Sequence, residues 1–358
     1  MDPKTLTELK KLYRDGFPED SEAAVSWFFS RVNEKNAAYF VTGGKPVSAG
    51  YIIDKPAVLW GRRRKMPYLS ALSTKTEYRG QGLIRSVITE LLSRLYRRGA
   101  PVCALYPFNH DYYKRFGFCD VSFCAERTIR GGETYPHLSI TPPFKELARV
   151  QSAFTKPFTN RLVFGAKEIL AKTEEFAVDG VPLYVYADGG KPFAYCFISG
   201  DQGLGVRGQG NGQLSDAAIF QPLAVRRPPP ATRFIYHYAA TDLEKFSRCE
   251  QLKGCAYIDF SESGRPYVQG RVVNAKAALE AAPYMPHLNK TVVLRITDPL
   301  IAENNRAFKV TIQDGRAAAA ETTEPPAQTL GIGELTQLLF LGDGLMVQKQ
   351  KNIFTDQY

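Results

Sequence analysis

Hydrophobic positions recur at helical spacing over one long segment in the first third of the chain. The apolar side chains of this segment are Leu83, Ile84, Val87, Ile88, Leu91, Leu92 and Leu95. They fall on one face of a helix, and polar side chains fall on the other. Arginines near its end, Arg94 and Arg97 among them, suit the negative end of the helix dipole, and Gly99 can end the helix. The pattern therefore predicts an amphipathic helix that ends just before Gly99.

A short apolar run and a glycine loop precede this helix. Residues Tyr68–Ser73 have the pattern of a strand, a polar turn follows through Tyr78, and the next four residues are Arg79-Gly80-Gln81-Gly82. A helix N-terminus offers unpaired backbone N–H groups and a positive dipole end, which together bind phosphate. Both glycines let the backbone approach a ligand closely, and the arginine adds a charged donor. The alternative is a plain turn in which the glycines only shape the connection.

The same patterns predict the other elements around this unit. Helices are expected over Thr5–Tyr13 and Ser21–Val32, a hairpin over Ala38–Thr42 and Val47–Ile53, and a short strand over Ala57–Trp60 before a basic turn over Gly61–Lys65. Further strands are expected over Val102–Tyr106 and Val121–Ala125, with one or two helical turns over Asn109–Phe118.

The length and composition describe a globular protein of more than one domain. A chain of 358 residues suggests two or three domains, and 44% hydrophobic with 23% charged residues exclude a disordered chain. No apolar run approaches the length of a membrane span, and the start of the chain lacks a secretory core segment. We therefore expect a cytoplasmic protein with no membrane partner.

The six cysteines form no recognisable metal site. They include no CxxC pair, and the spacings of Cys119 with Cys124 and of Cys249 with Cys255 do not fit common zinc sites. Reduced thiols in a cytoplasm are the simpler interpretation, and we expect no metal.

The net charge of +10 raises the question of nucleic-acid binding. The basic residues are scattered, and their local clusters, such as Arg62-Arg63-Arg64-Lys65, lack the interleaved aromatic residues of an RNA-binding motif. A solvated basic surface that partly serves an anionic cofactor explains the charge better, so we expect no nucleic-acid partner.

A family resemblance gives the glycine loop a specific role. Arg79-x-x-Gly82-x-Ile84 after a strand resembles the pyrophosphate-binding signature of GCN5-related N-acetyltransferases (GNAT), although that signature usually ends in Gly or Ala where this chain has Ile84. The run through Phe118 is similar to the enhanced-intracellular-survival (Eis) family, which carries a bulky residue and then Arg here, as in Gly82-Leu83-Ile84-Arg85. The acetyl-CoA-binding residues that the resemblance implies are Arg79, Gly80, Gln81, Gly82, Leu83 and Ile84 in the loop, Ala71, Leu72 and Ser73 at the strand edge, and Phe108 and Asn109 beyond the next strand.

The middle of the chain contains an echo of the first part. The hairpin around Gly43-Gly44-Lys45-Pro46 is answered by a similar run around Gly189-Gly190-Lys191-Pro192, and helical patterns cover Phe144–Phe154 and Lys167–Phe176. A chance similarity of hairpin turns is the alternative. If the echo is a repeat, this part is a degenerate second GNAT-like copy, because Gly200–Gly212 reads as a flexible loop with no helix after it to seat a phosphate.

The last part has a different pattern. A helix is expected over Ala275–Ala282, strands over Thr291–Ile296 and Phe308–Ile312, and a helix over Ile332–Phe340. This part resembles the sterol-carrier-protein-like domain that closes Eis-family chains, with the turn Arg295-Ile296-Thr297-Asp298-Pro299 as its most specific piece. The implied fold class is α+β / α/β: tandem GNAT-like domains, with mixed central sheets flanked by helices, plus a sterol-carrier-protein-like α+β domain. The implied domains span residues 1–126 (catalytic), 127–265 (degenerate) and 266–358, and the C-terminal tail of the last reaches the active site.

Tyr113 is the candidate proton donor. It stands before Lys114-Arg115-Phe116-Gly117 and so matches the Tyr-x-Arg-Phe-Gly motif of the Eis family, in which the tyrosine protonates the departing thiolate. A phenol with a reference pKa of about 10 can donate a proton at neutral pH. The alternative is an aromatic residue that only packs.

The candidate proton acceptor is the terminal carboxylate of Tyr358, because in Eis-like enzymes the chain end enters the active site. The alternative is a frayed terminus. His110 is a possible substitute base, although a hydrogen-bonding or surface role suits it better. Glu19, Asp20 and Glu22 could attract a cationic amine, or they could simply charge and cap a helix start.

Together these features predict an acetyl-CoA-dependent N-acetyltransferase. The acceptor would be a primary amine (aminoglycoside-like, a small amine or lysine) that attacks acetyl-CoA directly in a ternary complex. The resemblance also implies a homo-oligomer, by analogy a hexamer. The alternative function is a non-catalytic acyl-CoA-sensing or lipid-binding scaffold, which would keep the Arg79 loop but would not require Tyr113 or the terminal carboxylate.

Overall fold

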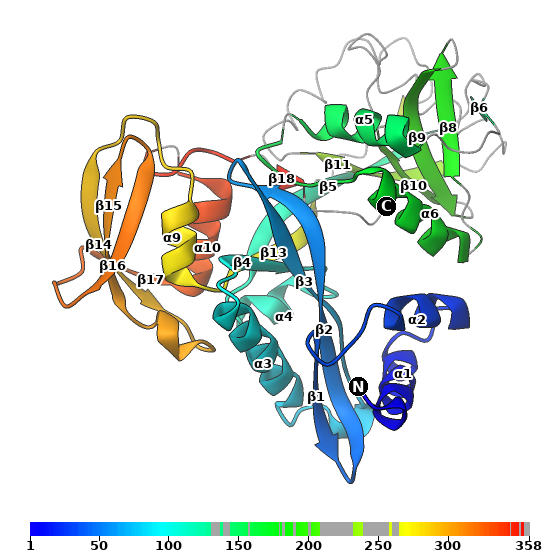
Figure 1. Cartoon of the computed structure of the whole chain (residues 1–358), viewed down its shortest axis with the longest axis horizontal. Coiled ribbons are helices and arrows are strands. Elements are labelled where there is room, and N and C mark those ends of the chain that lie inside the picture. The colour runs from blue at the N-terminus through cyan, green and yellow to red at the C-terminus, as the bar shows by residue number, and fades with distance from the viewer. Residues whose placement is uncertain are drawn as a thin grey trace. The chain divides into compact units, whose positions relative to one another are not determined.

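The structure is a computed structural model. It describes residues 1–129, 137–138, 144–156, 158–178, 180, 183–188, 191–199, 202–207, 232–238, 258–259, 265–343, 345–350 and 352–353. The chain divides into two compact units, each made of two segments (Figure 1). Unit 1 contains Met1–Val121 and Tyr267–Gln350, and unit 2 contains Ser122–Pro266 and Lys351–Tyr358.

A mixed sheet lies at the centre of unit 1. Its strands are β1 (Ala37–Thr42), β2 (Lys45–Leu59), β3 (Arg62–Thr74), β4 (Val102–Leu105) and β13 (Arg265–Val272), and β5 (Cys119–Ile129) follows β13 in the order. The strands β1, β2 and β3 pair antiparallel, β3 pairs β4 in parallel, and β13 pairs β4 antiparallel. Because β13 comes from far along the sequence, this sheet is completed by a strand that the first 121 residues do not contain.

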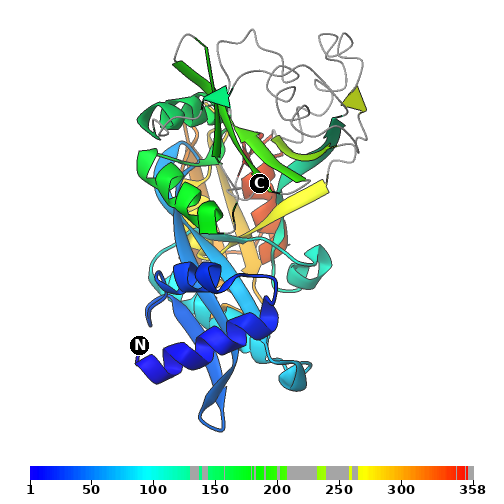
Figure 2. The ribbon, with the colours of Figure 1, turned by 90° about the vertical axis from the view of Figure 1, so that its right-hand side faces the viewer.

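Helices cover both faces of the sheet in unit 1. The helices α1 (Pro3–Gly16) and α2 (Glu22–Phe29) lie on one face, and Figure 2 shows α1, near the N-terminus, lying across β2 and β3. Alternate side chains of the strands separate two cores: Ala37, Ala49 and Tyr51 pack with α1 and α2, whereas Ala38 and Ile52 pack under α3 (Leu83–Arg97). The predicted helices are thus confirmed.

The predicted basic turn over Gly61–Lys65 is wrong, because most of these residues belong to β3. The turn consists of Trp60 and Gly61, with φ angles of 51° and 74°, and Leu59 pairs directly with Arg62. Three of the four residues Arg62–Lys65 are exposed. A solvated strand end lacks the apolar alternation by which a strand is recognised, so the hairpin of β2 and β3 is longer than its sequence pattern.

The C-terminal part of unit 1 forms a second, smaller sheet. Its strand order is β16 (Arg316–Thr322), β15 (Ala307–Gln313), β14 (Lys290–Thr297) and β17 (Gln328–Gly331). The helices α9 (Ala275–Ala281) and α10 (Ile332–Leu341) pack beside it (Figure 1). The predicted helices and the strands β14 and β15 are confirmed, whereas β16 and β17 were not predicted.

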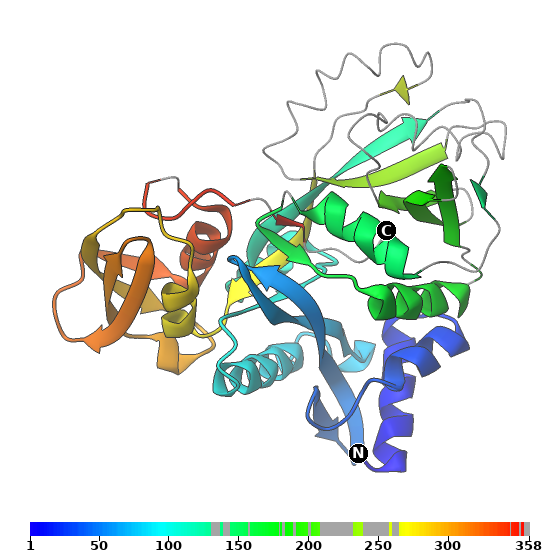
Figure 3. The same cartoon turned by 45° about the horizontal axis from the view of Figure 1, so that its top comes forward.

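Unit 2 contains another run of paired strands. Its order is β5-β11-β10-β9-β8-β6, formed by β11 (Thr232–Tyr238), β10 (Gln202–Arg207), β9 (Lys191–Ser199), β8 (Leu183–Asp188) and β6 (His137–Leu138) together with β5. Figure 3 shows the helices α5 (Phe144–Thr155) and α6 (Ala166–Val178) beside this sheet. The short strand β12 (Ile258–Asp259) pairs with β5, and β18 (Asn352–Ile353) pairs with β7 (Asn160–Leu162).

The hairpins of the two units share one register. Phe40 pairs with Ser48 and Val41 with Pro46, and in the same way Tyr186 pairs with Ala194 and Ala187 with Pro192, so one extra residue interrupts both hairpins at the same place. In both units an antiparallel meander is followed by a parallel pair, β3 with β4 and β10 with β11.

The predicted flexible loop over Gly200–Gly212 is wrong in part, since Gln202–Arg207 is the strand β10. The remaining residues of that range, apart from these six, lie outside the described residues. Within the described part of the chain, no helix combines the length and the apolar character needed to cross a membrane.

Candidate active site

The glycine loop leads into a helix whose first turn is uncapped. Gly82 occupies the N-cap position of α3 with φ 77°, and no side chain forms a cap hydrogen bond there. Gly80 also has a positive φ, 79°, and a Cβ atom at either glycine would meet nothing within 4 Å. The backbone conformation therefore favours glycine, and the first N–H groups of α3 have no side-chain cap.

Arg79 is held beside this loop by the end of β3. Its Nε donates a hydrogen bond to the carbonyl oxygen of Thr74 at 3.1 Å, and its side chain is exposed. The guanidinium group keeps its remaining N–H donors for solvent or a ligand. A positive charge and an uncapped helix start thus lie next to each other in the sequence and suit a pyrophosphate.

The strand edge predicted to bind the pantetheine arm contains a β-bulge. Tyr51 pairs with Ser70 and Ala49 with Ser73, so Ala71 and Leu72 together face the single residue Gly50. Ala71 has a φ of 49°, which is strained for a residue with a side chain. Bulges of this kind redirect backbone groups and are frequent beside active sites.

The bulge coincides with a break in pairing on the other side of β3. The strands β3 and β4 pair only at Tyr68 and Ala104. Beyond this pair, β4 leaves the edge of β3 at Ala71 and Leu72 open, as a strand-like ligand requires, whereas the carbonyl oxygen of Ser73 accepts a hydrogen bond from Oγ of Ser48 at 3.2 Å.

Tyr113 lies in a short helical turn and is almost fully buried. The helix α4 (His110–Lys114) is capped by Asn109, whose side chain accepts a hydrogen bond from the backbone N–H of Tyr112 at 3.0 Å. The Tyr113 side chain is 4% exposed, and burial raises its pKa well above the usual value of a phenol. The phenol therefore keeps its proton at neutral pH and above.

Phe108 is the exposed neighbour of Tyr113. Its ring is 77% exposed and packs edge-on against Tyr113, with ring centroids 5.7 Å apart. Phe108 is thus the outer member of an aromatic cluster with Tyr112 and Tyr113. The predicted site residues Phe108, Asn109 and Tyr113 are thus brought together.

One hydrophobic core joins the three parts of the predicted site. Leu72 from the strand edge, Ile84 from the first turn of α3 and Tyr113 all pack against the same cluster of buried side chains. Leu72 packs directly against Gly50, since a Cβ atom at this glycine would lie 2.4 Å from Cδ2 of Leu72. Packing therefore fixes the start of α3 after the glycine loop, the bulged strand and the phenol relative to one another.

His110 takes part in a hydrogen-bonding network. Its Nδ1 lies 2.6 Å from a carboxylate oxygen of Asp120, which also accepts a hydrogen bond from Nε2 of Gln269 at 2.9 Å. The same Nε2 donates to the carbonyl oxygen of His110 at 3.0 Å. This agrees with the hydrogen-bonding role rather than that of a free base. Asp120 and Gln269 were not predicted from the sequence.

The acidic cluster near α2 is already engaged in two of its three carboxylates. Asp20 accepts a hydrogen bond from the hydroxyl of Tyr13 at 2.6 Å, and Glu22 forms an ion pair with Arg14. These contacts favour the helix-start interpretation of the cluster over an amine-binding one. Tyr358, the predicted proton acceptor, lies outside the described residues.

Comparison with known protein families identifies two parts of the chain. Residues 1–120 match the family model of the acetyltransferase (GNAT) domain, and residues 275–345 match that of the sterol carrier protein domain. The two resemblances found in the sequence are therefore confirmed at the level of these domains. No curated protein sequence matches the chain.

Solved structures share the fold at low sequence identity. A probable N-acyltransferase from Enterococcus faecalis aligns with a TM-score of 0.75 at 18% identity, and a GCN5-related N-acetyltransferase from Anabaena variabilis with 0.72 at 17%. Eis1 from Mycobacterium abscessus aligns with 0.64 at 13%. Each alignment covers 95% of this chain and 88% of the other. These similarities confirm the α+β fold class with mixed sheets flanked by helices.

Proposed function

We propose that this chain, an enzyme with an N-terminal GNAT acetyltransferase domain, transfers an acetyl group from acetyl-CoA to a primary amine. The proposed route is direct attack within a ternary complex, as in Eis-like enzymes. The observation that supports the proposal is the shared core beneath Leu72, Ile84 and Tyr113, because it holds the glycine loop, the strand edge and the Tyr113 phenol, the parts that the proposed reaction needs, around one cluster of side chains. Acceptors of three kinds fit this chemistry: aminoglycosides, small amines and lysine side chains.

The cofactor would be held by backbone groups more than by side chains. The uncapped N–H groups of Gly82, Leu83 and Ile84, with Gly80 and Gln81 beside them, suit the pyrophosphate, and Arg79 adds charge. The open strand edge at Ala71 and Leu72, with Ser73 next to it, suits the amides of the pantetheine arm and the thioester oxygen. Phe108 and Asn109 would contact the cofactor from beyond β4.

The acetyl transfer is accompanied by proton transfers at both ends of the reacting groups. The amine nitrogen forms a bond to the carbonyl carbon while the carbon–sulfur bond breaks, the thiolate takes a proton from the hydroxyl of Tyr113, and the proton that the new amide nitrogen then loses restores this hydroxyl. Burial keeps this hydroxyl protonated until negative charge develops on the sulfur. We propose the terminal carboxylate of Tyr358 as the group that takes the proton of the ammonium, delivered by the tail of the C-terminal domain.

The proposed domains are the catalytic domain (1–126), a degenerate GNAT-like copy (127–265) and the sterol-carrier-like domain (266–358). The shared hairpin register supports the repeat. Assembly as a homohexamer remains a prediction from the Eis resemblance, and light scattering after size exclusion tests it, since any smaller mass would contradict it.

A thiol-release assay with product analysis tests the function. The full-length protein is incubated with acetyl-CoA and one of three probes: kanamycin, spermidine or an Nα-blocked lysine ester. The proposal predicts amine-dependent thiol release with at least one probe, together with an equal amount of product heavier by one acetyl group. Thiol release that no probe accelerates would contradict it.

A further inference from the structure

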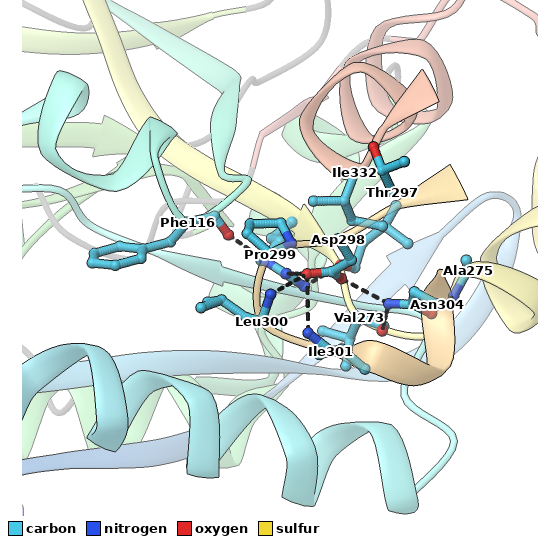
Figure 4. Close-up of polar contacts among 12 residues, drawn as sticks. Phe116, Val273, Ala275, Thr297, Asp298, Pro299, Leu300, Ile301, Asn304 and Ile332 are labelled. Atoms are coloured by element: carbon cyan, nitrogen blue, oxygen red, sulfur yellow. Dashed lines mark hydrogen bonds and ion pairs between the residues drawn. The ribbon is translucent and has the colours of Figure 1, made fainter. Parts of the chain in front are cut away.

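A buried ion pair lies where the acetyltransferase domain meets the C-terminal domain within unit 1. Arg271, from β13, and Asp298, from the turn after β14, both have side chains that are 0% exposed, and Nη2 of Arg271 lies 2.6 Å from Oδ1 of Asp298, the carboxylate labelled in Figure 4. Burying two charges is unfavourable unless further hydrogen bonds satisfy them. The remaining polar atoms of this buried pair therefore need hydrogen-bond partners.

The carboxylate of Asp298 is completely surrounded by donors. Besides Arg271, its Oδ1 accepts hydrogen bonds from the backbone N–H groups of Leu300 and Ile301, at 2.9 and 3.1 Å, and Oδ2 accepts from Nδ2 of Asn304 at 2.9 Å. The turn of Asp298 is thereby locked in one conformation (Figure 4). Such a fully satisfied network specifies position rather than only adding stability.

The other end of Arg271 reaches the turn that contains the proposed proton donor. Its Nε donates to the carbonyl oxygen of Phe116 at 2.6 Å. The carbonyl oxygen of Tyr113 accepts hydrogen bonds from the backbone N–H groups of Phe116 and Phe118, at 2.9 and 3.3 Å. Two hydrogen bonds thus connect the guanidinium group of Arg271 with the backbone of Tyr113.

The same turn also contacts the cofactor helix. The carbonyl oxygen of Pro299 accepts a hydrogen bond from Nη2 of Arg85, in the first turn of α3, at 3.1 Å. Ile301 packs in the core that contains Tyr113, with Leu300 and Ile84 packed against it. Residues Asp298–Ile301 of the C-terminal domain are therefore linked both to the turn that contains Tyr113 and to the helix that follows the glycine loop.

We propose that Arg271 and Asp298 are positioning residues for acetyl transfer: anchored by Asp298, Arg271 holds the backbone of the Phe116 turn so that the Tyr113 hydroxyl reaches the departing sulfur. The inference rests on the proposed function. It gives the C-terminal domain a role in the first active site that does not depend on the chain terminus. Neither residue touches the reacting atoms.

The substitution Arg271→Lys isolates this link. Lysine keeps the charge beside Asp298 but has no Nε–H to donate to the carbonyl oxygen of Phe116. We expect kcat to fall about 10- to 100-fold, because small misplacements of a catalytic group cost rates of this order. The dissociation constant of acetyl-CoA, measured by calorimetry, should stay within about twofold, since the contacts of the glycine loop are unchanged.

Arg306→Lys is the matched control. Arg306 also donates from Nε to a carbonyl oxygen, that of Glu303 at 3.1 Å, and also pairs with a carboxylate, that of Glu321 at 3.0 Å. Arg306 lies in the same domain, but it is exposed and has no contact with the turn that contains Tyr113 and Phe116. Its substitution should leave kcat unchanged. An equal fall of kcat in both variants would overturn the proposal.

A double-mutant cycle separates positioning from general damage. In a Tyr113→Phe background there is no phenolic proton to place, so Arg271→Lys should change kcat less than about twofold. If the two effects multiply instead, Arg271 acts on something other than Tyr113 and the proposal is wrong.

Hydrogen exchange gives a readout that does not need turnover. In Arg271→Lys, the amides of Phe116 and Phe118 should exchange faster, whereas those of β14 and β15 should not. Asn305→Ala is a second variant, because Asn305 holds the backbone of Asp298 from outside, with its side chain at 2.6 Å from the N–H and 3.0 Å from the carbonyl oxygen. It should speed the same two amides. If the wild-type protein shows no turnover, only the proposed function is contradicted. If hydrogen exchange is unchanged in both variants, the positioning role is refuted.

Discussion

At the scale of single residues, the motif Tyr113-Lys114-Arg115-Phe116-Gly117 combines two different tasks. Tyr113 is the proposed proton donor, and its resemblance to the Eis motif concerns chemistry. Phe116 and Gly117 are explained by the C-terminal domain instead. The carbonyl oxygen of Phe116 accepts a hydrogen bond from Arg271, and Gly117 has a φ of 84° and lies against Ile332. The second half of the motif is therefore the attachment point of the domain that follows.

Gly117→Ala should destabilise the protein more than a positive φ alone explains. The added Cβ would lie 2.4 Å from Cγ2 of Ile332, so steric overlap adds to the backbone strain. We expect a loss of about 2–4 kcal/mol in urea-induced unfolding. Gly43→Ala is the control, with a φ of 58° and nothing within 4 Å, and should cost only about 1 kcal/mol. Equal losses would show that the contact with Ile332 is unimportant.

At the residue level, the sequence names candidates where chemistry follows the residue type in a local motif. The glycines of the loop, Phe108, Asn109 and Tyr113 are named in this way, and their roles stay predictions. Arg271 and Asp298 could not be assigned a role, because an arginine in a strand and an aspartate in a turn are ordinary until their separation of 2.6 Å is known. The sequence around Asp298 resembles a turn of sterol-carrier-protein-like domains, and this resemblance assigns no role to the carboxylate.

At the scale of elements, α3 and β3 show why some boundaries were predictable and others not. The helix was predicted closely, since one apolar face and a glycine at each end mark it. The bulge at Ala71 was invisible, because it arises from pairing two residues of β3 with one of β2. Pairing register is a property of two segments, and no local pattern records it.

Arg79→Gln should weaken acetyl-CoA binding without affecting the fold. The substitution removes a positive charge next to the uncapped start of α3, and we expect a roughly tenfold rise in the dissociation constant, measured by titration calorimetry. Arg97→Gln removes the same charge from the opposite end of α3 and should have little effect. Equal effects would mean that net charge, rather than the loop, attracts the cofactor.

At the scale of the whole molecule, the two compact units do not follow the sequence in simple order. Unit 1 uses β13 from residues 265–272 next to β4, and unit 2 uses most of β5 next to β11. The sheet of unit 1 thus includes a strand, β13, that follows the main segment of unit 2 in the sequence. A linear reading of domain boundaries cannot detect this arrangement, since a strand's own pattern does not tell which sheet it joins.

Three of the buried tyrosines should make the protein sensitive to alkaline pH. Burial raises the pKa of Tyr51, Tyr113 and Tyr284 above that of an exposed phenol. Their contribution to stability is complete below the unfolded-state pKa of about 10 and is lost as the pH rises above it, by about 1.4 kcal/mol per pH unit for each group. Above about pH 10, the midpoint temperature of thermal unfolding should fall less steeply with rising pH in Tyr51→Phe than in wild type. Parallel curves would contradict this expectation.

The measurement that tests the account most directly is the turnover number of Tyr113→Phe beside that of Tyr112→Phe. Both substitutions remove one hydroxyl from the same helical turn and keep the aromatic ring. The account predicts that Tyr113→Phe lowers kcat about 100-fold or more, with acetyl-CoA binding retained, because the thiolate loses its proton donor. Tyr112→Phe should remain close to wild type. A Tyr113→Phe enzyme that turns over within twofold of wild type would contradict the central claim.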